Sequence, residues 1–117
     1  MRDGRCALTD WGESCAAHPF FTLAVMLRSA AHTLGLAVDA PEVVALRDIY
    51  LEAWQPFAPR AALLEASELA QRLGMVCRAL TWHRVVTSLE EPMRSEYADA
   101  VPGWMEEFIR KASDDYD

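Results

Sequence analysis

A chain of 117 residues, of which 52% are hydrophobic and 25% charged, has the composition of one folded domain rather than of a disordered segment. Its 18 acidic and 11 basic residues give a net charge of −7, which argues against sequence-independent binding to nucleic acid. Cys6, Cys15 and Cys77 form no Cys-x-x-Cys pair and therefore predict free thiols in a reducing compartment. With no secretory signal and no apolar run of about 18 residues, we expect a cytoplasmic protein that does not cross a membrane.

The N-terminal residues predict a short β-strand or hairpin. Asp3-Gly4 favours a hairpin turn, and the strand that follows it runs from Arg5 to Thr9. A lone short strand is unstable in water and no second strand candidate lies downstream, so we expect its partner before residue 1. At the end of this strand stands Asp10-Trp11-Gly12. A carboxylate in that position holds Mg²⁺ in phosphoryl-transfer enzymes, although the same pattern also marks an ordinary turn.

The rest of the chain predicts helices, of which the first is opened by Pro19 and ended by Gly35. Its apolar residues share one helical stripe and predict the central buried helix: Phe20, Leu23, Ala24, Leu27, Ala31 and Leu34. A second helix follows Asp39, which we expect to cap it, and Pro41. Its predicted inner face comprises Val43, Leu46, Tyr50, Ala53 and Phe57, and Pro56 and Pro59 end it.

A long third helix is predicted from Arg60 to about Ser88. Its expected inner face is apolar or small throughout: Leu63, Ala66, Ala70, Leu73, Cys77 and Leu80. Gly74 in its middle lowers the stability of the helix by about 1 kcal/mol relative to alanine. Its presence therefore predicts either a close approach of another helix or a kink at this position. Beyond a loop at residues 90–92, a short helix is predicted from Met93 to Ala100 and a last one from Pro102 to about Ala112, before an acidic tail.

Several separated stretches together resemble one enzyme family. Asp10-Trp11-Gly12-Glu13, His18-Pro19-Phe20-Phe21 and Leu23-Ala24 resemble the aminoglycoside phosphotransferase-like kinases, relatives of the protein kinases that include choline and homoserine kinases. Residues 79–84 and 96–104 are similar to the C-terminal helices of that family. The resemblance implies a mainly α fold, the C-terminal helical part of a protein-kinase-like C-lobe with a short N-terminal strand or hairpin, in a single domain over residues 1–117.

The resemblance also implies a reaction, the transfer of the γ-phosphoryl group of ATP to a hydroxyl group of a small molecule. Asp10 would bind the Mg²⁺ that bridges the ATP phosphates, and would thus serve both as metal ligand and as cofactor-binding residue. Candidate substrate-binding residues are Glu13, His18, Trp82 and His83. Each has a structural alternative: a solvated loop for Glu13, local packing or hydrogen bonding for His18, and core packing for the Trp82-His83 pair. Thr22 stands where many relatives carry an aspartate that braces the catalytic loop.

Several parts of such a kinase are missing from the sequence, which contains one lysine, Lys111, no asparagine, no Gly-rich loop and no His-x-Asp. We therefore assign no catalytic residue, and we expect the isolated chain neither to bind ATP and Mg²⁺ tightly nor to turn over. One alternative function is a non-catalytic helical module that docks onto a partner chain, or onto a second copy, through the strand at residues 5–12. Another is an unrelated small acidic helical protein whose likeness to the family is accidental.

Overall fold

The computed structural model describes residues 16–114, and this part of the chain is mainly α-helical, as predicted. It contains five helices and no strand: α1 (Phe21–Leu34), α2 (Pro41–Glu52), α3 (Arg60–Ser88), α4 (Met93–Glu96) and α5 (Ala100–Asp114). The predicted strand at residues 5–9 and the predicted metal ligand Asp10 lie outside the described residues. The long third helix has the limits expected from the sequence.

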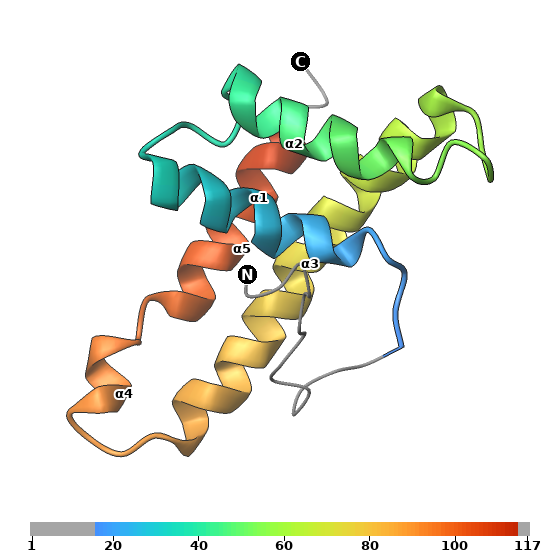
Figure 1. Ribbon diagram of the computed structural model, residues 1–117. Coiled ribbons are helices and arrows are strands. Elements are labelled where there is room, and N and C mark those ends of the chain that lie inside the picture. The colour runs from blue at the N-terminus through green and yellow to red at the C-terminus, as the bar shows by residue number, and fades with distance from the viewer. Residues whose placement is uncertain (1–15, 115–117) are drawn as a thin grey trace, which may run out of the picture.

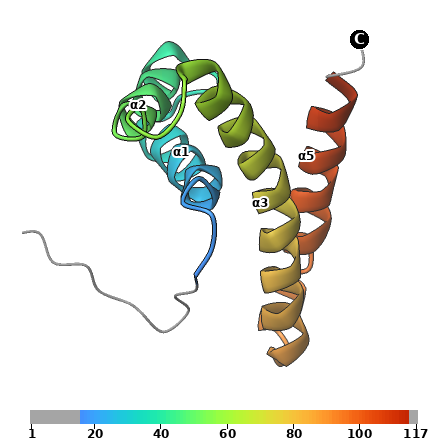
Figure 2. The same ribbon diagram turned by 90° about the vertical axis from the view of Figure 1, so that its right-hand side faces the viewer.

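The longest helix, α3, lies between the others. Helices α1 and α2 pack on one side of it and α5 on the other, while the single turn of α4 reverses the chain at its far end (Figures 1 and 2). The N-terminal half of the molecule is thus a three-helix cluster of α1, α2 and the start of α3. The C-terminal half is a pair of neighbouring helices, α3 and α5.

The apolar stripe of α1 forms the centre of the first cluster. Five of its six predicted residues are buried: Phe20, Leu23, Ala24, Leu27 and Ala31. The sixth, Leu34, is 58% exposed, and Val25 on another face is 39% exposed, so α1 is not buried on all sides. Its neighbours among the described residues leave these faces of the helix uncovered. Gly35 ends α1 with φ 65°, the left-handed conformation that glycine adopts without strain.

Helix α2 is shorter than predicted and is capped differently. Its N-cap is Ala40 with no side-chain hydrogen bond, so the expected capping by Asp39 is wrong, because Pro41 already occupies the first helical position. The helix ends at Glu52, and Phe57 beyond it is 79% exposed, while Leu46 on the predicted inner face is also exposed. Its buried side chains are Val43 and Leu51. The predicted inner face was wrong at Phe57 because the helix ends before it, and at Leu46 because that position lies on an exposed face of the helix.

Gly74 lies where α3 crosses α1. A Cβ atom built at this glycine would lie 2.7 Å from the Cβ of Ala24, closer than two carbon atoms approach in folded proteins. The sequence predicted either a close approach or a kink at Gly74, and the close approach is confirmed. Ala24 is itself buried, so the contact sets the distance between the two helices through their smallest residues.

The predicted inner face of α3 is right at its start and wrong farther along. Leu63 and Ala70 are buried, but Leu73, Cys77 and Leu80 are exposed. The buried residues from the middle of the helix onward lie on another face: Gln71, Gly74, Met75 and Ala79. One apolar stripe is expected for a helix that packs against one neighbour, whereas α3 packs against α1 with one face and against α5 with another. Ser67 is also buried, and its hydroxyl donates a hydrogen bond to the carbonyl of Leu64 at 2.8 Å.

The C-terminal helices differ from prediction by a few residues. Helix α4 ends at Glu96 rather than Ala100, and α5 begins at Ala100, before the expected start at Pro102. Pro102 still falls in the first turn of α5, where its missing N–H group has no partner to lose. The earlier start is stabilised by the N–H of Gly103, which donates to the carbonyl of Asp99 at 2.9 Å.

Candidate functional site

The predicted site residues do not gather in one place. Asp10 and Glu13 lie outside the described residues, so their roles stay predictions. His18 is exposed at the start of α1, where its Nδ1 accepts a hydrogen bond from the N–H of Phe20 at 3.3 Å. Trp82 lies elsewhere, beside the last turns of α1, and stacks on Tyr97 with ring centroids 5.5 Å apart. His83 is exposed on α3.

His18 does not line the open hollow that Trp82 borders, so the structure does not bring these two candidates together there. His18 has the local hydrogen bond that its structural alternative expected. Trp82 is half-buried and lines an open hollow, so it is the one described candidate with space beside it.

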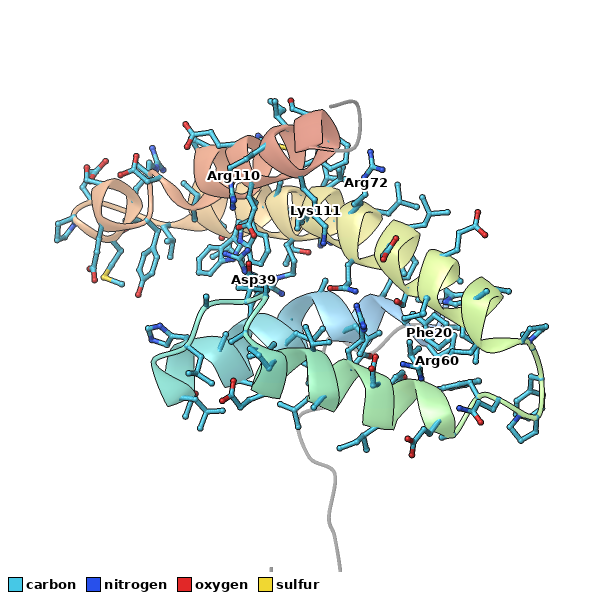
Figure 3. All side chains as sticks on the ribbon, turned by 90° about the horizontal axis from the view of Figure 1, so that it is seen from above. Phe20, Asp39, Arg60, Arg72, Arg110 and Lys111 are labelled. Atoms are coloured by element: carbon cyan, nitrogen blue, oxygen red, sulfur yellow. The ribbon has the colours of Figure 1, made fainter. Side chains whose placement is uncertain are left out.

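A groove of about 830 Å³ lies between α1 and the start of α2 on one side and α3 and α5 on the other. We call this the charged groove, because nine ionisable side chains line it. The basic ones are Arg28, Arg47, Arg72, Arg110 and Lys111. The acidic ones are Asp39, Glu65, Glu68 and Glu107. Figure 3 shows Arg110 and Lys111 of α5 on one side of the gap between the helices and Asp39 of the α1–α2 loop on the other.

A second hollow of about 640 Å³ adjoins the first between the outer face of α1, α3 and the start of α5. We call it the aromatic hollow, because its walls carry three rings, Trp82, Tyr97 and Trp104. Its other apolar lining residues are Val25, Ala31, Leu36, Val38 and Ala100, and its polar lining is Arg28, Ser29, His32 and Arg78. Arg28 and Val38 line both spaces, which therefore form one continuous surface depression.

Arg28 connects the two halves of the molecule across this depression. Its guanidinium forms an ion pair with Glu107 of α5 and lies 4.4 Å from the centroid of the Trp104 ring. Both side chains of the ion pair are partly shielded from solvent, and the face of the ring attracts the cation electrostatically. Arg110 also approaches Glu107, at 3.9 Å, from the next turn of α5. These contacts hold α1 and α5 together although α3 lies between them.

A second set of charges joins α2 to the start of α3. Asp48 accepts hydrogen bonds from Arg47 at 2.9 Å and from Arg60 at 2.8 Å. The hydrogen bond from Arg47 is the main reason that the pKa of the Asp48 carboxyl lies below its ordinary value of 3.8. Arg60 lowers it further, and partial burial opposes both. The position of Arg60 beside the α1–α2 cluster is visible in Figure 3.

The arginines that line both spaces were not predicted as site residues from the sequence. One signal was available, because Arg28 is the only Arg, Lys, Asp or Glu between Phe20 and Leu34. A single charge inside a long apolar stretch needs a partner or a path to solvent, and this favours an ion pair. The identity of that partner, Glu107, depends on how α5 returns along α3. No spacing in the sequence predicts it.

Comparison of the chain with protein-family models, with curated proteins and with solved structures found no match. Within residues 16–114, no three His, Cys, Asp or Glu side chains come together in a way that could hold a metal ion. None of the helices described there is both long enough and apolar enough to span a membrane. The site is therefore interpreted from its own residues.

Proposed function

We propose that this chain is the C-terminal helical part of an ATP-dependent kinase that phosphorylates a hydroxyl group of a small molecule. The proposal rests on the resemblance of residues 10–24 to the aminoglycoside phosphotransferase-like kinases, with Asp10 as the Mg²⁺ ligand. The helical character of residues 16–114 is compatible with the expected C-lobe.

The observation that best supports the proposal is the attachment of the His-Pro-Phe segment to the helices. The carbonyl of Pro19 accepts a hydrogen bond from the hydroxyl of Tyr50 at 3.0 Å. Phe20 is 2% exposed and meets the rings of Tyr50 and Trp54 edge to face. A segment that carries a metal ligand must leave the scaffold from a defined point, because catalysis needs that ligand positioned precisely. Pro19 and Phe20 supply such a point a few residues after Asp10.

The other parts of the kinase must come from outside these 117 residues. The sequence has no asparagine for a second metal, no His-x-Asp base and no lysine near Asp10, so one carboxylate would face Mg²⁺ alone. Within the proposal, the 117 residues position Asp10 and support it through α1 and α2. Thr22 is exposed in this chain and stands where many relatives carry the bracing aspartate.

The test begins with the coding sequence upstream of the Met1 codon, which should encode in frame a His-x-Asp and a later asparagine. The polypeptide with that extension is then assayed for ATP-dependent phosphorylation of amino-sugar, choline and homoserine substrates. Asp10→Asn should lower the rate about a hundredfold or more, because a metal ligand contributes several kcal/mol to the transition state. Asp99→Asn, a matched change at an exposed carboxylate, should leave the rate unchanged. The proposal is wrong if the extension lacks these residues, or if the two variants behave alike.

A further inference from the structure

Arg78 of α3 is a partly buried cation whose charge is not neutralised by any described residue. No Asp or Glu of residues 16–114 lies within ion-pair distance of it, and its buried Nε–H group has no hydrogen-bond partner there. A buried donor without a partner costs free energy, and more so on a charged group. Its guanidinium carbon lies 6.0 Å from the centroid of the Trp104 ring, which is a weak compensation at the limit of a cation–π contact.

The charges around Arg78 add to this excess. Arg28 lies against the same Trp104 ring as Arg78, and Arg28 already shares the single negative charge of Glu107 with Arg110, so this carboxylate leaves the charge of Arg78 without a partner. Like charges held close together repel one another unless an anion lies between or beside them. This local positive charge occurs in a chain whose net charge is −7, so it is not a consequence of composition.

Space for an anion exists next to Arg78, because the residue lines the aromatic hollow of about 640 Å³. The rings of Trp82, Tyr97 and Trp104 line its walls, and the ring surface not covered by the Trp82–Tyr97 stack or by Arg28 is apolar and suits a flat molecule. The two terminal N–H groups of an arginine form a fork that matches two oxygen atoms of a carboxylate or phosphate. The Nε atom of Arg78 is enclosed by protein atoms, so an anion in the hollow would meet this terminal fork.

We propose that the aromatic hollow binds a small organic oxyanion, with its carboxylate or phosphate group at Arg78 and an apolar, preferably aromatic, body against Trp82 and Trp104. Arg28 increases the local positive potential but is already paired with Glu107, so Arg78 provides most of the selectivity for the anion. This inference uses neither Asp10 nor the metal-binding turn, and it stands independently of the proposed kinase function.

The experiment titrates the ¹⁵N-labelled chain with two probes, benzoate and phenyl phosphate, and follows the side-chain N–H signals of Arg78, Trp82 and Trp104 by NMR. Saturable shifts of these signals at millimolar concentration are expected for at least one probe. The tighter of the two identifies whether a carboxylate or a phosphate is preferred. Benzamide, a neutral molecule of nearly the same shape as benzoate, should produce no saturable shift, because it lacks the charge that Arg78 requires.

Two variants test the residue itself. Arg78→Gln should weaken binding of the preferred probe at least about tenfold, as expected for the loss of a charge-assisted fork. Arg84→Gln makes the same change of charge at an exposed residue of α3 that lines neither space, and should bind as the unchanged chain does. The proposal is overturned if neither anion gives a saturable shift, if benzamide binds as well as benzoate, or if both variants bind equally. Should Arg78→Gln fail to fold, the comparison of benzoate with benzamide still decides.

Discussion

Replacing Gly74 with alanine tests the closest contact between α1 and α3. The added Cβ would lie 2.7 Å from the Cβ of Ala24, whereas ordinary contacts begin at 3.4 Å. Ala24 has no flexible side chain that could move aside, so the helices themselves must separate. Overpacking of this kind costs about 1–3 kcal/mol, against which the better helix propensity of alanine returns about 1 kcal/mol. We therefore expect Gly74→Ala to lower the free energy of unfolding by up to about 2 kcal/mol.

The control is Gly103→Ala in α5, where an added Cβ meets nothing within 4 Å. This change should raise the free energy of unfolding by up to about 1 kcal/mol, because only helix propensity is altered. Urea unfolding followed by circular dichroism at the helix band measures both variants. The difference between them isolates the steric cost at Gly74.

A double variant makes the test specific to the pair. Ala24→Gly removes the atom that the new Cβ would meet, so Ala24→Gly with Gly74→Ala should be more stable than the sum of the single changes by about 0.5–3 kcal/mol. If Gly74→Ala stabilises the chain as much as Gly103→Ala does, or if the two sites prove additive, α1 and α3 do not cross at this point. The packing described for the first cluster would then be wrong.

Two further changes test contacts made near the C-terminal end of α2. Tyr50→Phe should lower the free energy of unfolding by about 0.5–1.5 kcal/mol, because it removes the hydrogen bond to the Pro19 carbonyl; thermal melts would show it, and an unchanged melting temperature would contradict the contact. Asp48→Asn should destabilise the chain near neutral pH. Because folding lowers the pKa of Asp48, its contribution is present above the ordinary value of 3.8 and is lost as the pH falls through the lower folded value. The melting temperatures of Asp48→Asn and the unchanged chain should therefore converge in strong acid, and a gap that persists there would exclude this explanation.

The helix limits were largely predictable, since local chemistry determines them. Pro19 and Gly35 bracket α1, and the limits of α3 at Arg60 and Ser88 agree with the structure at both ends. Proline and glycine affect helix ends through their own backbone geometry, so their effects can be predicted without knowledge of the fold. The mainly α fold follows from the same signals. The prediction that Asp39 caps α2 was wrong because two local signals, a capping side chain and a proline at the first helical position, point to different first residues of the helix.

The buried faces and the arginine contacts were not predictable in the same way. Leu73 and Leu80 fit an apolar stripe as well as Met75 and Ala79 do, and the choice depends on which helix returns along α3. The pairing of Arg28 with Glu107 depends on the same tertiary arrangement. Of the candidate site residues, the structure describes His18, Trp82 and His83, and only Trp82 borders an open space. Ionic and cavity-lining roles emerge when distant segments meet, whereas sequence periodicity describes one segment at a time.

The length of α3 gives the molecule a mechanical property. Its 29 residues extend for about 43 Å, and α5 follows its C-terminal half while α1 and α2 are fastened to its beginning. A bend of about 5° at the middle would displace its far end by about 2 Å, and the part of α5 packed there would move with it. The ion pair between Arg28 of α1 and Glu107 of α5 would resist such bending. A change that weakens this ion pair would therefore alter the width of the charged groove and of the aromatic hollow together.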